Sequence, residues 1–292
     1  MKKNGTALAA LFTTAVLWGT GFVAIKYAIL RMDTYWFISL RFTIAALVTA
    51  LVFFRRFKTI TKTDIKHGVI LGLTLSAALT FQIVGCYYTT VGKNAFLSAT
   101  YVVMIPFLHW IRTKKRPSLF SFIAAVICIC GTAVISSGSA GGVNIGDMLS
   151  LLAGFFWGVT FELSSGFSQT SDTVNLQLVQ LPCASVVTIV ISTIMSPFPR
   201  HMNTGAALSL IYSAIFCIAI AFLLQLYGQR TVNSTLSGMI FSMESVFAGI
   251  FSVILLGDSI SLRLCIGGGL IFLAVITGCL DSKEKHDRRF SH

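Results

Sequence analysis

Charge is scarce in this sequence, and so is proline, the residue that interrupts helices. Of the 292 residues only 11% are charged and five are proline, whereas 55% are hydrophobic and 24 are phenylalanine. A soluble domain carries about 25% charged residues. Too little polar surface therefore remains to cover a globule in water. A lipid bilayer is the solvent that fits, because it allows an apolar exterior.

The motifs of several enzyme and metal-binding classes are also missing. The sequence contains no P-loop, no HExxH, no GxSxG and no paired-cysteine metal signature. Without a P-loop the chain itself cannot drive transport with ATP. Its seven cysteines all fall inside apolar stretches, where they are expected to be small apolar fillers. We therefore expect a protein that is not an enzyme and that holds neither a cofactor nor a metal.

What the sequence does contain is a series of long apolar stretches. A window of about 19 residues gives ten candidate membrane spans. Because ten spans of about 20 residues take up most of the chain, the loops between them must be short. The sequence thus predicts an all-α integral membrane protein with ten transmembrane helices. The spans lie near residues 7–29, 35–54, 67–89, 94–112, 118–137, 147–167, 174–194, 206–227, 234–256 and 262–280.

The distribution of lysine and arginine predicts the orientation. With a cytoplasmic N-terminus, sixteen of these residues fall in inner segments and four, Arg31, Lys93, Arg200 and Arg263, in outer loops. Lysine and arginine concentrate on the cytoplasmic side of membrane proteins. We expect a multi-pass protein of the plasma membrane with both termini in the cytoplasm. Most of the net charge of +12 then lies in these cytoplasmic segments, and we infer no nucleic-acid partner from it.

The chain repeats itself at an offset of 139 residues. Each half contains five predicted spans, an odd number, so the second copy enters the membrane from the opposite side. Such inverted repeats are typical of secondary transporters, with the substrate site near the midplane between the halves. We expect a first repeat over residues 1–140 and a second, with a short cytoplasmic tail, over 141–292. The matching positions are Trp18 with Trp157, Tyr88 with Tyr227, and 94–98 (NAFLS) with 233–237 (NSTLS).

Several strings in this order resemble the EamA-type members of the drug/metabolite transporter superfamily. They are WGTGFVAIKYAI followed by Arg41, residues 89–107, residues 227–258 and residues 267–276. The resemblance covers nearly the whole chain and implies ten helices in a five-plus-five inverted repeat and alternating access. It also implies transport, commonly export, of amino acids or other small metabolites. The sequence departs from the family pattern at Ser245, where proline is common, and at Asp258, where glutamate is usual.

Four charged residues lie within the predicted spans: Lys26, Arg41, Glu162 and Glu244. A charge at the bilayer centre costs about 2.5–3.5 kcal/mol on insertion scales, so such residues usually face a cavity or a partner. Lys26 and Glu162 fall on corresponding helix faces of the two repeats, which predicts one shared cavity. Two structural readings stay open: Lys26 as a residue that snorkels to the outer interface, and Arg41 as a brace bonded to backbone carbonyls.

Glu244 is the deepest of the four charges. It shares a helical stripe with Asn233 and Ser237, and the matching stripe of the first half carries Asn94 and Ser98. Because an ionised carboxylate is expensive at this depth, Glu244 is predicted either to exchange a coupling proton or to hold a substrate ammonium. Gln82, Trp18, Tyr88 and Trp157 are further candidates for the cavity wall, although packing explains the aromatic residues as well.

These observations predict a secondary transporter, most simply an exporter, of a small polar metabolite with an amino-acid-like zwitterion favoured. Lys26 and Arg41 would meet its carboxylate, and Glu244 with Glu162 its ammonium. An exporter of cationic amines or drugs is the alternative, with the two carboxylates dominant and the basic residues structural. A membrane sensor or scaffold without transport is the alternative from another class.

Overall fold

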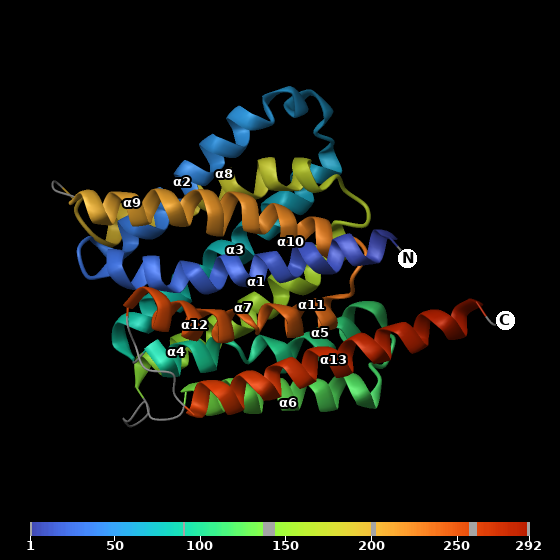
Figure 1. Ribbon diagram of the computed structural model, residues 1–292. Coiled ribbons are helices and arrows are strands. Elements are labelled where there is room, and N and C mark those ends of the chain that lie inside the picture. Colours follow the sequence, from blue (N-terminus) through green and yellow to red (C-terminus); the bar gives the residue numbers. More distant parts are fainter. Residues whose placement is uncertain (1, 90, 137–143, 200–202, 257–261, 291–292) are drawn as a thin grey trace.

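The computed structural model describes residues 2–89, 91–136, 144–199, 203–256 and 262–290. Every regular element in these ranges is a helix (Figure 1), which confirms the all-α prediction. The elements are α1 (Lys2–Ile29), α2 (Thr34–Val52), η1 (Phe54–Thr59), α3 (Lys62–Tyr88), α4 (Val91–Ser98), α5 (Tyr101–Thr113), α6 (Leu119–Ser136), α7 (Ile145–Phe167), α8 (Thr173–Met195), α9 (Thr204–Tyr212), η2 (Ser213–Ile220), α10 (Ala221–Gln229), α11 (Ser234–Phe241), α12 (Glu244–Leu256) and α13 (Leu262–Phe290).

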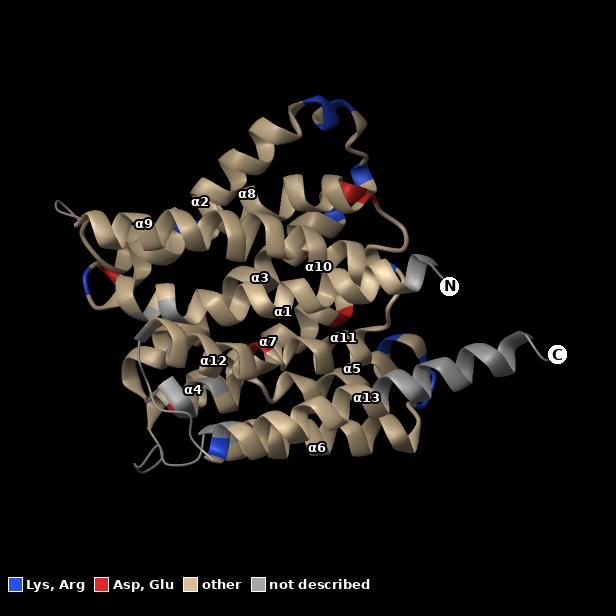
Figure 2. Ribbon diagram, in the orientation of Figure 1, with Lys and Arg blue, Asp and Glu red and all other residues tan. Residues whose placement is uncertain are grey.

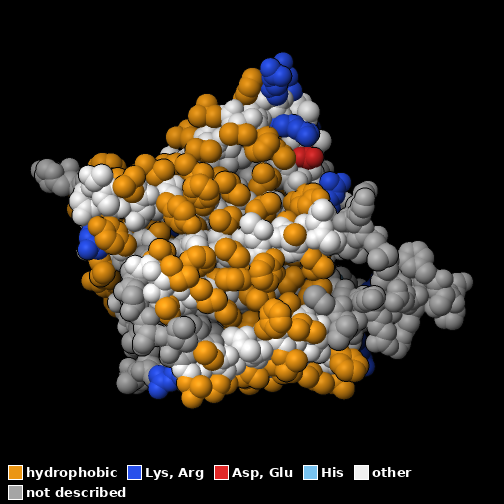
Figure 3. Space-filling view, in the orientation of Figure 1, with side chains coloured by type: hydrophobic (Ala, Val, Ile, Leu, Met, Phe, Trp, Pro, Cys, Tyr) orange, Lys and Arg blue, Asp and Glu red, His pale blue; other side chains and the backbone are white. Residues whose placement is uncertain are grey.

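Seven helical stretches of the described chain are long and apolar enough to cross a membrane, and two shorter apolar helices accompany them. Hydrophobic side chains cover the broad face of the molecule in Figure 3, while charged ones lie near its edges. The chain is therefore a multi-pass membrane protein. The seven stretches are Gly5–Ile29, Thr34–Val52, Lys62–Tyr88, Ile145–Phe167, Thr173–Met195, Thr204–Gln229 and Ser234–Leu255, and the shorter two are Leu119–Val134 and Cys265–Thr277.

The molecule has two ends, which differ in charge. We call the end at which α1 begins and α13 ends the terminal end, and the end at which α1 turns into α2 the opposite end (Figure 1). Basic residues gather at the terminal end, on η1 and around the end of α5 (Figure 2). The opposite end shows fewer of them in the described chain.

Equivalent caps start two helices of the two halves. Asp33 begins α2 and accepts a hydrogen bond from the Trp36 amide at 3.0 Å, while Asp172 begins α8 and accepts from the Val174 amide at 3.0 Å. An aspartate at this position satisfies backbone donors that have no partner within the helix. The two caps are 139 residues apart, so the repeat extends to the residues that determine where helices begin.

Helix contacts repeat at the same offset. A Cβ atom on Gly19 of α1 would collide with Phe247 of α12, and one on Gly158 of α7 would lie 3.1 Å from Leu108 of α5. Gly158 and Leu108 each lie 139 residues from their counterparts, Gly19 and Phe247. Glycine on a helix face permits such close approach of a neighbouring helix. The α1–α12 and α7–α5 contacts are thus the same contact made twice.

Two of the predicted spans are broken in the middle. The span over 94–112 divides into α4 and α5, and the span over 234–256 divides into α11 and α12, with Ser242 and Met243 between them. Pro106 lies inside α5, where it has no N–H to donate to the carbonyl of Val102, and this weakens the turns of α5 that follow the first break. At the second break, the Ser242 hydroxyl bonds the Gly238 carbonyl at 3.1 Å, a contact that bends helices.

The close approach of α7 to the α4–α5 break gives a testable expectation. A Cβ atom on Gly154 would lie 2.6 Å from the Thr100 hydroxyl and 2.9 Å from the carbonyl of Leu97, whereas one on Gly269 would meet nothing within 4 Å. We expect Gly154→Ala to lower the free energy of unfolding by about 1–3 kcal/mol. Gly269→Ala, the matched control, should leave it unchanged or slightly raised. Unfolding in detergent micelles measures both, and equal stabilities would contradict this packing.

Candidate functional site

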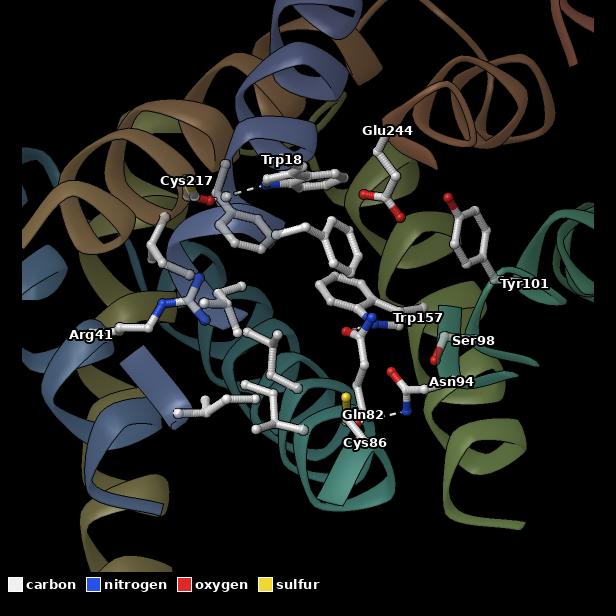
Figure 4. A pocket seen from close by; sticks show the side chains of 18 of the residues that line it. Trp18, Arg41, Gln82, Cys86, Asn94, Ser98, Tyr101, Trp157, Cys217 and Glu244 are labelled. Carbon is white, nitrogen blue, oxygen red and sulfur yellow. Dashed lines mark hydrogen bonds between the residues drawn. The ribbon is translucent and has the colours of Figure 1, made fainter. Parts of the chain in front are cut away.

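A cavity lies between the two halves of the bundle and receives side chains from both (Figure 4). Its lining runs from Trp18, in the middle of α1, to Ile29 at the last residue of that helix, and on α3 from Leu79 to Cys86. It therefore extends from the middle of the molecule toward the opposite end. About 940 Å³ of empty space lies within it, including the open solvent at its mouth.

Aromatic rings form the wall of the cavity that faces the terminal end. The Trp18 ring contacts the rings of Trp157, Phe161, Phe222 and Phe241, with centroids 5.1–6.0 Å apart. Trp18 and Trp157 are repeat-related, so the two copies of one tryptophan meet at the centre of the molecule. Offset and edge-on ring contacts at these distances stabilise a packed layer. The layer closes the cavity toward the terminal end.

Several predicted site residues line the cavity with their polar groups already bonded within the protein. Trp157 donates from Nε1 to the side-chain oxygen of Gln82 at 2.9 Å, and Asn94 donates from Nδ2 to the Gln82 carbonyl at 2.8 Å. Trp18 donates from Nε1 to the carbonyl of Cys217 at 3.0 Å. That carbonyl belongs to the π-helical stretch η2, and π-helical turns are frequent at functional sites. These groups shape the wall.

Arg41 enters the cavity from α2 without an ionic partner in the described part of the chain. It is 3% exposed, its Nε atom has no hydrogen-bond partner, and its guanidinium lies 5.1 Å from the centroid of the Phe37 ring. A buried guanidinium normally binds a carboxylate or phosphate, often with two parallel hydrogen bonds. Arg41 is therefore available to an anionic group that enters the cavity.

Glu244 is the first residue of α12, directly after the break between α11 and α12, and its carboxylate faces the cavity on the side opposite Arg41 (Figure 4). Neither a hydrogen bond nor an ion pair of this carboxylate occurs within the described ranges. A carboxylate in an apolar site is costly unless it is paired, hydrogen-bonded or protonated. One cavity therefore contains a guanidinium and a carboxyl group that do not pair with one another.

Two hydroxyl groups on the α4–α5 side complete the polar lining. Ser98 ends α4 and Tyr101 begins α5, and each is 3% exposed with a hydroxyl oxygen that has no partner among the described residues. Ser98 belongs to the predicted stripe, whereas Tyr101 does not. Tyr101 follows Ser98 by three residues and Asn94 by seven, a spacing that puts all three on one helical face. This spacing is the signal in the sequence that would have identified Tyr101.

The sequence-based expectation that Glu162 shares this cavity is wrong, because Glu162 does not line it. It is buried on α7 near the terminal end, where its carboxylate pairs with Arg112 Nε and lies 3.1 Å from His109 Nδ1. The Ser234 hydroxyl at the start of α11 also donates to it. Glu162 lies on a face of α7 that contacts α5 of the other half, as helical phase indicated, but its carboxylate meets Arg112 and His109 there, whereas the neighbouring Phe161 lines the cavity.

The remaining predicted site residues lie elsewhere. Tyr88 is half exposed against Tyr87, Asn233 caps α11 through a hydrogen bond from the Leu236 amide, and the Ser237 hydroxyl is buried outside the cavity lining. The Lys26 side chain lies outside the described residues. Sequence reasoning did not select Phe161 and Phe222, which belong to the aromatic layer. The described ranges contain no cluster of three metal-ligating side chains.

A multi-pass helical bundle with a mostly apolar cavity, and with isolated charges inside it, has the architecture of a small-molecule transporter. Comparison with known proteins identifies the family. The family model for EamA-like transporters matches residues 5–137 and again 144–277, so the family unit occurs twice. The chain belongs to the EamA-like transporter family.

Two relatives and one solved structure illustrate the similarity. An uncharacterized transporter of Archaeoglobus fulgidus is 32% identical over 91% of this chain and 83% of its own length. The uncharacterized transporter YoaV of Bacillus subtilis is 21% identical over 89% of this chain and 92% of its own length. A crystal structure with 16% sequence identity superimposes with a TM-score of 0.80 over 96% of this chain and 98% of the other. The last comparison establishes the fold alone.

Proposed function

We propose that this protein is a secondary transporter, working as an exporter, of a small amino-acid-like zwitterion that binds in the cavity between the halves. The observation that carries the proposal is the presence of Arg41 and Glu244 on one cavity, each without an ionic partner in the described chain. A substrate carboxylate at Arg41 and a substrate ammonium at Glu244 would neutralise both. The aliphatic side chains of Ile25, Leu79 and Ile218 would then surround an apolar substrate body.

Transport in this proposal uses alternating access between two inverted repeats, residues 1–140 and 141–292, with five membrane crossings each. The broken pairs α4–α5 and α11–α12 each count as one crossing, as does the run from α9 to α10, and α6 and α13 supply the shorter two. The repeated caps and repeated glycine contacts support equivalence of the halves. Discontinuous helices at the substrate site are a recurrent feature of such transporters.

We further propose that the protein lies in the plasma membrane with the terminal end in the cytoplasm, as the basic residues at that end favour. In a background without the native cysteines, a cysteine at Lys58 should react with a membrane-impermeant maleimide only after the cells are opened. A cysteine at Leu30, in the α1–α2 turn region, should react in intact cells. The reverse pattern would contradict the orientation.

A cationic amine is the second candidate substrate, and the aromatic layer favours it. Aromatic faces attract ammonium groups, most strongly when water is excluded. The rings of Trp18 and Trp157 lie in the same cavity as the Glu244 carboxylate. Arg41 would then have only a structural role.

Flux into proteoliposomes separates these functions. We expect uptake of L-leucine to exceed that of 3-methylbutylamine, its decarboxylated form, and that of 4-methylpentanoate, which lacks the ammonium. Uptake of the amine alone would favour the second candidate. No flux of any compound across a panel of amino acids and amines would contradict transport and favour a sensor or scaffold.

A further inference from the structure

Tyr101 and a polar cluster around Glu162 carry inferences beyond the proposed function. The first is Tyr101. Its ring is fixed edge-on against Phe161, with centroids 5.0 Å apart and an interplanar angle of 77°. Its hydroxyl makes no hydrogen bond of ordinary geometry within the described residues, although the Ser242 hydroxyl lies near it, and it points toward the Glu244 carboxylate across the cavity (Figure 4). Burial of an unbonded hydroxyl is unfavourable unless a ligand completes it.

We propose that Tyr101 determines specificity for a primary ammonium group. This inference rests on the proposed function. A primary ammonium has three N–H donors, and the Glu244 carboxylate together with the phenol oxygen would accept two of them. A trimethylated ammonium has no N–H donor, so it forms no hydrogen bond with the phenol oxygen. Removal of the hydroxyl should therefore affect only ligands that can donate.

Tyr101→Phe tests this, because it removes one oxygen atom and keeps the ring contact. Binding of L-leucine to purified protein should weaken about five- to tenfold, while binding of N,N,N-trimethyl-leucine stays within twofold. Tyr88→Phe, on an exposed tyrosine outside the cavity, is the matched control and should change neither. Equal binding of leucine by the wild type and Tyr101→Phe overturns the role of Tyr101. Wild-type protein that binds neither ligand contradicts the proposed function instead.

The second group is the cluster around Glu162, hereafter the Glu162 cluster: His109, Arg112, Glu162 and Ser234. It connects three elements, because His109 and Arg112 lie on α5, Glu162 on α7 and Ser234 on α11. Gly166, one turn after Glu162, leaves the space that the guanidinium occupies, since a Cβ atom there would lie 2.6 Å from Arg112 Nη1. The cluster lies between the aromatic layer and the terminal end, and it holds parts of both halves together.

The repeat-related positions contain no counterpart of this cluster. The residues 139 positions away from its four members are Ala248, Phe251, Val23 and Ala95, all of them apolar. In an inverted repeat, the contacts that close one end of the protein have repeat-related equivalents that close the other end in the alternative state. A charged contact between the halves that has no repeat-related equivalent therefore stabilises one state and not the other.

We propose that the Glu162 cluster is a gate that keeps the terminal end closed and biases the substrate-free protein toward the state that is open at the opposite end. The inference depends on alternating access but not on the identity of the substrate. A ligand or mutation that breaks the cluster shifts the equilibrium by as much as the cluster stabilises one state over the other.

Cysteine reactivity without substrate tests the gate. Cys86 lines the cavity, while Ser165 is 1% exposed on α7 near the Glu162 cluster. In single-cysteine proteins, a water-soluble maleimide should label Cys86 readily and a cysteine at Ser165 slowly. Glu162→Gln should raise labelling at position 165 at least tenfold and lower labelling of Cys86. Asp33→Asn, a carboxylate change at the opposite end, is the control and should not raise labelling at 165.

A second variant distinguishes opening of the gate from misfolding of the Glu162→Gln protein. Gly166→Ala keeps every charge but displaces the Arg112 guanidinium from the space beside Gly166 that it occupies, and it should change labelling in the same direction. If Glu162→Gln and Gly166→Ala proteins both label as the wild type does, the cluster is not a gate. Flux of leucine is not needed for this result, so loss of the proposed substrate would leave the gate intact.

Discussion

Glu244→Gln is expected to weaken binding of a zwitterionic substrate about ten- to hundredfold. Hydrogen bonds to a charged group contribute about 1.5–3 kcal/mol each, which corresponds to that range. The carboxylate faces the cavity directly (Figure 4). No other group within the described residues pairs with it, so a bound ammonium would lose its anionic partner in this variant. Titration calorimetry with L-leucine measures the change. N-acetyl-leucine, which lacks the ammonium, serves as the ligand control and should be insensitive to the substitution.

The same variant separates the two roles that the position of Glu244 allows. If the carboxylate binds the substrate ammonium, both exchange and net transport should fall along with affinity. If it carries a coupling proton, accumulation driven by a pH gradient should disappear while exchange of substrate across the membrane continues. Unaltered affinity, exchange and pH response in Glu244→Gln would leave this residue with a structural role only.

The candidate residues that line the cavity were selected from the sequence by their charge and by the repeat. Arg41 and Glu244 stand out in the sequence because charges deep in a membrane span are expensive, and both line the cavity. Trp18 and Trp157 stand out as a repeated pair, and they meet at the centre of the molecule. Such features are local in sequence or periodic, so the sequence alone is enough to recognise them.

Glu162 shows why the rest was not predictable. Its helical phase was right, but its environment depends on Arg112, which the sequence presents as one of several basic residues at the end of a span. Only the packing of α5 against α7 brings that guanidinium back over Gly166 to the carboxylate. A contact between residues 50 positions apart is determined by tertiary packing, to which periodicity within one helix is insensitive.

The helix breaks were missed for a related reason. Hydropathy over 94–112 and 234–256 is continuous, and apolar content alone does not distinguish a straight helix from a broken one. Yet the two breaks determine the site, because Tyr101 follows one and Glu244 follows the other. Pro106 and the Ser242 hydroxyl are the signals in the sequence, and each is common enough in intact membrane helices to be weak evidence by itself.

Arg41→Gln is expected to weaken binding of L-leucine about ten- to hundredfold, the range that one or two hydrogen bonds to a charged group provide. It should leave binding of 3-methylbutylamine unchanged, because only the zwitterion presents a carboxylate. Calorimetry with the two ligands measures this difference. An equal loss of affinity for both ligands would show that Arg41 does not bind the substrate carboxylate.

Stability of the substrate-free protein distinguishes this role from that of a structural brace. A brace that bonds backbone carbonyls stabilises the fold, so its removal should lower the unfolding temperature. Arg41 instead is 3% exposed, its Nε has no partner, and no hydrogen bond of its guanidinium occurs in the described chain. A buried charge without compensation costs free energy in the empty protein. Arg41→Gln should therefore unfold at the same temperature as the wild type or a higher one. Lower stability together with unchanged leucine binding would assign Arg41 to the scaffold, and the cationic amine would become the better substrate.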